Sequence, residues 1–151
     1  VLDVFFLQDM NNQAIEGKEE LARIRTTLEQ SLTGSMKLEK ALLARWQQTP
    51  LRVRQMPVPS RVLLSNKISN THSVIEVNGR AFPGLLHKIT LCLASLGLQI
   101  QTATVSTYGE RVVDVFYVKD IFGLQIQSET RQQTIRNRLL AIFDDADEDA
   151  V

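Results

Sequence analysis

The feature that most constrains the fold of this chain is an internal duplication. The segment Val1–Asp9, VLDVFFLQD, recurs without a gap as Val112–Asp120, VVDVFYVKD, at an offset of 111 residues (112 − 1). The same register continues downstream, where Ile24 pairs with Ile135. The match crosses a strand-like stretch, a polar loop and a helix-like stretch, which indicates two copies of one structural unit.

Both copies follow the same order of elements. An aromatic and β-branched run ends at an aspartate, a polar loop follows, and a helix pattern begins near Lys18 in the first copy and near Ser128, an N-cap residue type, in the second. We expect each helix to dock on a sheet through an apolar stripe. The two stripes are Leu21, Ile24, Leu28 and Leu32, and Ile135, Leu139, Ile142 and Phe143.

The second copy, residues 72–143, is nearly a complete unit. Its predicted elements are a strand over 72–78, a helix over 85–96, strands over 98–107 and 111–119, and a helix over 128–143. This order is the beginning of a ferredoxin-like βαββαβ unit, so we predict an α+β fold. A break in the apolar alternation between Ile100 and Ala103 predicts a β-bulge. The fourth strand is missing, because residues 144–151 are acidic and predict a solvated tail.

The first copy, residues 1–68, shows only the later half of such a unit. It has a third strand, a second helix and a fourth strand at Arg61–Ser65. A linker over 33–60 joins the last two, and the boundary between the copies falls at Asn66–Thr71. A half-unit leaves a sheet edge and an apolar face uncovered. We expect residues outside this sequence, a second chain or the second copy to complete it.

Within the linker, Leu38–Trp46 has the spacing of a short helix, and the proline-rich segment Thr49–Ser60 predicts an extended, helix-free stretch. The chain opens inside a strand pattern without an initiator Met. We therefore expect it to be part of a longer protein.

Charge and composition exclude several classes of function. Seventeen basic residues balance 17 acidic ones, so the chain lacks the basic excess of general nucleic-acid-binding or membrane-surface proteins. No apolar run is long enough to span a bilayer, and no signal peptide opens the chain. A single cysteine, Cys92, excludes an internal disulfide framework and favours a cytoplasmic location.

The candidate binding site connects the first strand of the second copy to its first helix. A polar turn precedes Pro83 and Gly84, which are expected to open the helix. Gly84 permits a close approach to the main chain, and the free N–H groups of a first helical turn suit an acceptor or a carboxylate. This combination indicates binding rather than catalysis, and its alternative is a plain strand-to-helix connection. The residues are Asn78, Gly79, Arg80, Ala81, Phe82, Pro83, Gly84, Leu85 and Leu86.

The other residues with reactive side chains favour structural roles. Asp3 and Asp114 sit inside apolar strands with no partner at ligand spacing, so we expect them to face solvent or bind the main chain. His72 and His87 have no cysteine or carboxylate cluster around them, which makes a zinc site improbable. Cys92 lies near the apolar stripe of its helix and is expected to act as a small hydrophobic residue. We therefore predict no catalytic residue and no metal ligand.

Several motifs of the second copy resemble those of an ACT domain, the small-molecule-sensing βαββαβ module. They are Val74–Gly79 with Pro83–Leu86, Thr107–Asp120, and Phe122-Gly123. With the first copy included, the chain is similar to the tandem ACT pair at the C-terminal end of a family of nucleotidyltransferases that modify the PII signal protein. Residues 1–68 resemble the end of the first ACT domain and residues 72–143 resemble the second.

The resemblance implies a regulatory role. In that family a Mg-dependent nucleotidyltransferase domain and an HD-type hydrolase domain attach UMP to PII and remove it, and the ACT pair senses glutamine. This chain contains neither catalytic domain, so it would be a sensor without activity or a cofactor of its own. The family's ligand loop corresponds to Asn78–Leu86. This chain has Ala81-Phe82 where such domains commonly carry Asp-Arg, which leaves the identity of the ligand open.

Two functions are compatible with these residues. The first is amino-acid sensing. The second is an ACT-type dimerisation scaffold without a ligand, for which Val113, Val115 and Tyr117 would supply an apolar sheet face. An RNA-binding role is disfavoured, because Phe116 and Tyr117 are adjacent and point to opposite faces of their strand.

Overall fold

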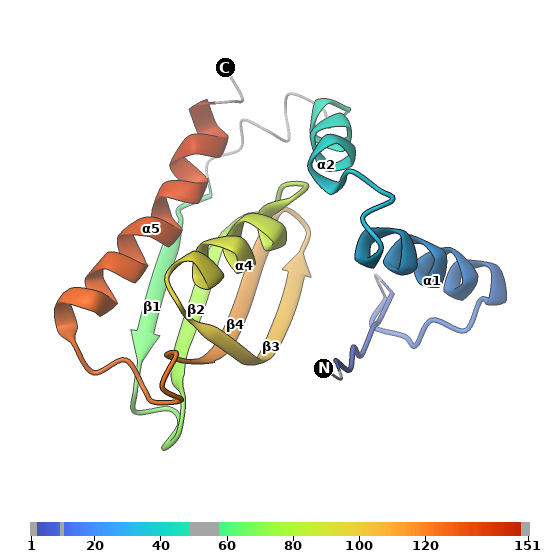
Figure 1. The fold of residues 1–151 in the computed structure, drawn as a ribbon. Coiled ribbons are helices and arrows are strands. Elements are labelled where there is room, and N and C mark those ends of the chain that lie inside the picture. The colour runs from blue at the N-terminus through green and yellow to red at the C-terminus, as the bar shows by residue number, and fades with distance from the viewer. Residues whose placement is uncertain (1–2, 10, 49–57, 149–151) are drawn as a thin grey trace. The chain divides into compact units, whose positions relative to one another are not determined.

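A computed structural model describes residues 3–9, 11–48 and 58–148 of the chain (Figure 1). The chain divides into two compact units, Val1–Ala41 and Leu42–Val151. Helix α2 (Leu38–Gln47), which the spacing predicts, spans the boundary between them. Residues 49–57 of the predicted extended segment lie outside the described residues, and 58–60 have no regular secondary structure.

The larger unit is built on a four-stranded antiparallel sheet with the strand order β1-β2-β4-β3. Helices α4 (Leu85–Ser95) and α5 (Glu129–Glu148) pack on one face of it (Figure 1). The predicted α+β class and the order strand–helix–strand–strand–helix are confirmed. The four strands are β1 (Arg61–Ser65), β2 (Ser73–Arg80), β3 (Gln99–Tyr108) and β4 (Arg111–Lys119).

Alternate residues of the strands and one face of each helix make a single core. Phe116 at the centre of β4 is fully buried, as are its cross-strand neighbour Ile75 and, on the helices, Ile89 and Leu139. Each such side chain stabilises the fold by about 1.5–3 kcal/mol. The predicted bulge is also confirmed, because the register of β3 against β4 shifts between Ile100 and Thr102.

Strand β1 occupies the position of the missing fourth strand. The sequence pattern assigns this strand to the first copy, whereas the structure pairs it with β2, from Arg61 opposite Asn78 to Ser65 opposite Val74. The residues between β1 and β2 connect two strands of one sheet. A hairpin closed by a short connection costs less chain entropy than a distant pairing, and it covers the edge of β2.

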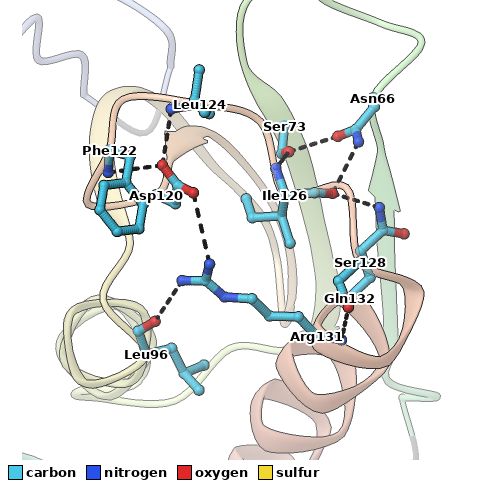
Figure 2. A network of polar contacts seen from close by, with 10 residues as sticks. All are labelled: Asn66, Ser73, Leu96, Asp120, Phe122, Leu124, Ile126, Ser128, Arg131 and Gln132. Atoms are coloured by element: carbon cyan, nitrogen blue, oxygen red, sulfur yellow. Dashed lines mark hydrogen bonds and ion pairs between the residues drawn. The ribbon is translucent and has the colours of Figure 1, made fainter.

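Side chains from distant parts of the chain hold this hairpin in place (Figure 2). Ser73 Oγ donates to Asn66 Oδ1 at 2.6 Å and accepts the N–H of Ile126 at 2.9 Å. Asn66 Nδ2 donates to the carbonyl of Ile126 at 3.0 Å. Gln125 Nε2 donates to the carbonyls of Ser69 and His72, both at 2.9 Å. The connection is thus fixed to the segment that leads into α5.

Helix α5 is longer than the sequence predicts. Its start agrees with the expected N-cap, because Ser128 Oγ accepts the N–H of Arg131 at 3.3 Å. Its end at Glu148 places most of the predicted acidic tail in a helix. Ala146 is 3% exposed and continues the buried stripe of Ile142 and Phe143, which explains why the helix does not end there.

The smaller unit lacks the strand that the sequence predicts at its beginning. Residues 3–7 have no strand structure, and Phe5 and Phe6 are 68% and 94% exposed. A strand needs a hydrogen-bonded neighbour, and the described residues of this unit supply only an isolated bridge between Gln8 and Ala14. The predicted helix forms as α1 (Lys18–Leu32), but none of its residues is buried. The expected docking of this helix on a sheet is therefore not seen.

Each unit nevertheless contains an aspartate loop, and the two loops have the same pattern of hydrogen bonds. Asp9 Oδ1 accepts the N–H groups of Asn11 and Gln13, both at 2.8 Å. Asp120 Oδ1 accepts those of the residues 111 positions further on, Phe122 and Leu124, both at 2.9 Å. Helices α1 and α5 also begin 111 residues apart (129 − 18). These correspondences favour the predicted duplication.

Candidate functional site

The predicted binding stretch runs from the end of β2 to the start of α4, but its first part is a strand and not a turn. Asn78, Gly79 and Arg80 pair with Val113, Val112 and Arg111 of β4. An Asn-Gly pair favours a hairpin turn when local preference decides. Here β2 pairs with β4 up to Arg80, which lies opposite Arg111. This strand pairing outweighs the local preference for a turn.

The start of α4 has no side-chain cap, and the side chain of Leu42 lies against it. Gly84 is the N-cap, with φ +90°, and no side chain caps this terminus. The N–H of Leu85 donates to the carbonyl of Phe82 at 3.1 Å, and that of Lys88 donates to Gly84 at 2.9 Å. Pro83 precedes the helix and does not lie in its first turn. A helix end without a side-chain cap leaves N–H groups of its first turn for another acceptor.

The aromatic residue of the loop belongs to the core. Phe82 meets Phe143 of α5 edge to face, with ring centroids 6.3 Å apart, and Lys88 Nζ lies 5.7 Å from the Phe82 centroid. Phe143 also packs directly against the main chain of Gly79. Ala81 is half-buried against the same core, and Leu85 is 3% exposed.

The nine predicted residues therefore do not converge on one point. Gly79 and Leu85 face the helix-covered core, whereas strand alternation places Asn78 and Arg80 on the opposite face of the sheet. Asn78 Nδ2 donates to Glu76 Oε1 at 2.7 Å. Leu86 is 42% exposed. The groups best placed to bind a ligand are the main-chain donors at the start of α4.

Glu110 joins this region, although the site prediction does not include it. The N–H of Ala81 donates to the carbonyl of Glu110 at 2.7 Å, which ties the loop to the turn between β3 and β4. Glu110 Oε2 is buried and has no hydrogen-bond partner among the described residues. The sequence signal was the motif Tyr108-Gly-Glu-Arg111, which predicts only a turn.

Asp114 is a buried carboxylate in the centre of the sheet. It is 1% exposed, lies opposite Val77 and Val105, and accepts the N–H of Ser106 at 3.2 Å. Burial raises the pKa of Asp114 to about 6, and the Ser106 hydrogen bond opposes the rise. The prediction of main-chain binding is confirmed for Asp114. Its counterpart in the first copy, Asp3, is exposed.

The remaining candidates have structural surroundings. Cys92 is half-buried against the core, as predicted, and burial raises the pKa of its thiol although Arg138 opposes the rise. His87 is half-buried. The described ranges contain no group of three or more His, Cys, Asp or Glu side chains placed to hold a metal ion. They also contain no helix with the length and apolar character to cross a bilayer.

A cavity of about 600 Å³ lies at the other end of the sheet, where Lys119, Asp120, Ser128 and Arg131 line it. Arg131 Nη2 donates to the carbonyl of Leu96 at 3.3 Å, and Nη1 lies 3.8 Å from Asp120 Oδ2 (Figure 2). The Asp120 and Arg131 side chains of this cavity therefore tie the loop after β4 to α5. This cavity could not be predicted from the sequence, because two stretches far apart in the chain, 70–71 and 119–131, form it.

Comparison with known proteins identifies relatives over nearly the whole chain. The chain is 47% identical over 140 residues to the bifunctional uridylyltransferase/uridylyl-removing enzyme of Rhodospirillum rubrum, covering 93% of this chain and 15% of that protein. The corresponding proteins of Azospirillum brasilense and Gluconobacter oxydans are 47% and 43% identical over 140 and 141 residues. These matches cover 92% and 93% of this chain and 15% of each relative.

No protein-family model and no solved structure matches the chain. The chain spans about 15% of the length of the relatives it matches. It belongs, over that span, to the family of bifunctional uridylyltransferase/uridylyl-removing enzymes.

Proposed function

We propose that this chain is a regulatory ACT module that senses glutamine and carries out no reaction itself. The observation that supports this most directly is the uncapped N-terminus of α4, whose first-turn N–H groups suit the carboxylate of an amino acid. The sheet topology is that of a ferredoxin-like unit, the architecture expected of an ACT domain.

The proposed effect is to shift the balance between two opposing activities located elsewhere in the full-length protein. These would be the attachment of UMP to the PII signal protein and its removal, with Mg as the metal of the catalytic domains. A ligand shifts such an equilibrium only by the difference in its affinity for the two states. Glutamine would therefore bind one arrangement of the module more tightly than the other.

Isothermal titration calorimetry of the 151-residue chain tests the proposal. We expect heat of binding with L-glutamine and weaker or no binding with L-glutamate, L-asparagine and L-isoleucine. Gly84→Ala should weaken glutamine binding about tenfold, because alanine at φ +90° strains the helix end. Gly123→Ala, at φ +78° near the other end of the sheet, is the matched control and should bind as the wild type does. The absence of heat with all four amino acids would contradict the proposal.

A second candidate function, a dimerisation scaffold, is favoured by the edge strand β3. Nine of its ten residues are exposed, none is charged, and its outer edge has no neighbouring strand in the described part of the chain. Such an edge can pair with another strand. Sedimentation velocity should then show a dimer that Val105→Lys converts to a monomer. A wild-type monomer at all concentrations would exclude this function.

A further inference from the structure

The cavity of about 600 Å³ beside the loop after β4 has the size of a small-molecule site and an excess of positive charge. Lys119 at the end of β4 and Arg131 in the first turn of α5 line it, and Asp120 is the one acidic residue among its described lining residues. Leu124 and Ile126 add an apolar part to the wall. This combination suits a small anion that also carries an apolar group.

Two contacts fix the guanidinium of Arg131 at this cavity without using most of its N–H groups (Figure 2). Nη2 donates to the carbonyl of Leu96 at 3.3 Å, and Nη1 lies 3.8 Å from Asp120 Oδ2, which is longer than a hydrogen bond. The side chain is 38% exposed, so a molecule in the cavity can reach it. A guanidinium has five N–H groups, and one that is already held in place can bind an oxyanion through two of them.

The carboxylate of Asp120 does not cancel both cations. Its Oδ1 accepts the N–H groups of Phe122 and Leu124, both at 2.9 Å, and its Oδ2 is the atom nearest to Arg131 in their ion pair. Lys119 forms no ion pair with any described residue. The wall therefore keeps one uncompensated positive charge, which attracts an anion and repels the ammonium of an amino acid.

The shape of the aspartate loop does not require these two cations. The loop of the smaller unit has the same hydrogen bonds, which its Asp9 accepts. The residue 111 positions before Lys119 is Gln8, and the one 111 positions before Arg131 is Glu20. The same loop thus forms with a neutral and an acidic side chain in these places. A bound anion gives the cations of the larger unit a role that loop formation does not.

We propose that this cavity binds a small oxyanion, either a phosphate monoester or a carboxylate without an amino group, through Arg131 and Lys119. The guanidinium donates two hydrogen bonds to the oxyanion, and Lys119 supplies the second positive charge. The apolar part of the ligand packs against Leu124. The inference does not rest on glutamine sensing, because the cavity lies at the other end of the sheet from the loop before α4.

Amide chemical-shift titrations of the ¹⁵N-labelled chain at low ionic strength test this inference with three probes of similar size. Phenyl phosphate and benzoate carry the two kinds of oxyanion on the same apolar ring, and benzyl alcohol carries no charge. The variants are Lys119→Gln and Arg131→Gln. The matched control is Arg111→Gln, which removes one positive charge at the exposed first residue of β4.

We expect saturable shifts of residues 119–131 with at least one of the two anions, and at least tenfold weaker binding of benzyl alcohol. Whichever anion binds more tightly identifies the kind of oxyanion that the site prefers. Lys119→Gln and Arg131→Gln should each raise the dissociation constant of that anion roughly 5- to 20-fold, and Arg111→Gln should leave it within about twofold. If Arg131→Gln also lowers Tm, because it unties α5 from the loop, the result for Lys119→Gln decides.

Three results would overturn the inference, and none of them bears on the binding of glutamine. One is the absence of saturable shifts of residues 119–131 with either anion. Another is equally tight binding of benzyl alcohol, which would make the cavity an apolar hollow without preference for charge. The third is an unchanged dissociation constant in Lys119→Gln, which would remove this residue from the site.

Discussion

At the scale of single residues, Gly79 lies where the ring of Phe143 packs directly on the main chain of β2. A Cβ atom at this position would clash with the ring of Phe143, so the ring or the strand would have to move. We expect Gly79→Ala to lower the free energy of unfolding by about 1–3 kcal/mol, measured by urea denaturation. Adding Phe143→Leu should recover part of the loss. No recovery would show that another contact causes the effect.

Asp114 should make stability depend on pH. Its pKa is raised from 3.8 to about 6 because the carboxylate is buried, so ionisation costs more in the folded state than in the unfolded state. The folded state then binds more protons between about pH 4 and about pH 6, and the free energy of unfolding should fall across this range. The free energy of unfolding should fall by roughly 2–3 kcal/mol in total. It should not fall further above about pH 6.

Asp114→Asn is the variant that isolates this contribution. The amide does not titrate, so the difference between wild type and variant should grow from about pH 4 to about pH 6. Urea denaturation at several pH values measures it. Parallel curves for the two proteins would show that Asp114 is not the group responsible.

The residues that were predicted correctly are those whose surroundings are local. Asp114, which was expected to bind the main chain, accepts an N–H group of the neighbouring strand. Gly79 lies in a strand and not in the expected turn, and the ring of Phe143 from α5 packs against it, which is a contact that the local sequence does not reveal. Glu110 was missed because burial of one oxygen atom leaves no trace in a sequence.

At the scale of elements, β1 should be necessary for the sheet. Leu64 faces the core at 9% exposure, while its neighbour Leu63 is 39% exposed on the other face. We expect Leu64→Asp to destabilise the chain by about 3 kcal/mol or more, because it buries an unpaired charge. Leu63→Asp should cost about 1 kcal/mol or less. Urea denaturation compares the two variants. Equal losses in the free energy of unfolding would contradict the placement of β1 in the sheet.

The corresponding helices α1 and α5 should respond differently to the same substitution. Leu139 is fully buried in α5, and Leu28, its counterpart in α1, is 46% exposed. Leu139→Ala should cost about 2–5 kcal/mol, since it leaves a cavity, and Leu28→Ala about 1 kcal/mol or less. Denaturation followed by circular dichroism measures both. Similar losses would mean that α1 is buried as deeply as α5.

Element types were predictable because apolar periodicity determines them, and the strands and helices of the second copy appear near their expected positions. Pairing was not predictable in the same way. The sequence gives β1 the composition of a strand, but its partner depends on the Asn66, Ser73 and Ile126 contacts. The expected first strand is absent over its described residues, 3–7, for the same reason, because strand structure requires a neighbour.

At the scale of the whole molecule, the chain combines a repeated loop–helix pattern with one complete sheet. The repeat is visible in the sequence and in the matching hydrogen bonds of the two aspartate loops. The complete unit carries a helix end without a side-chain cap at one end of its sheet and a cavity at the other. The relatives extend well beyond this chain, so membership of their family does not identify which of these two places binds a ligand.

Amide chemical-shift mapping of the ¹⁵N-labelled chain during titration with L-glutamine tests the central claim most directly. The account predicts saturable shifts concentrated on residues 79–86 and on Glu110. Unchanged spectra at saturating glutamine would contradict it, as would shifts confined to the residues that line the cavity near Arg131.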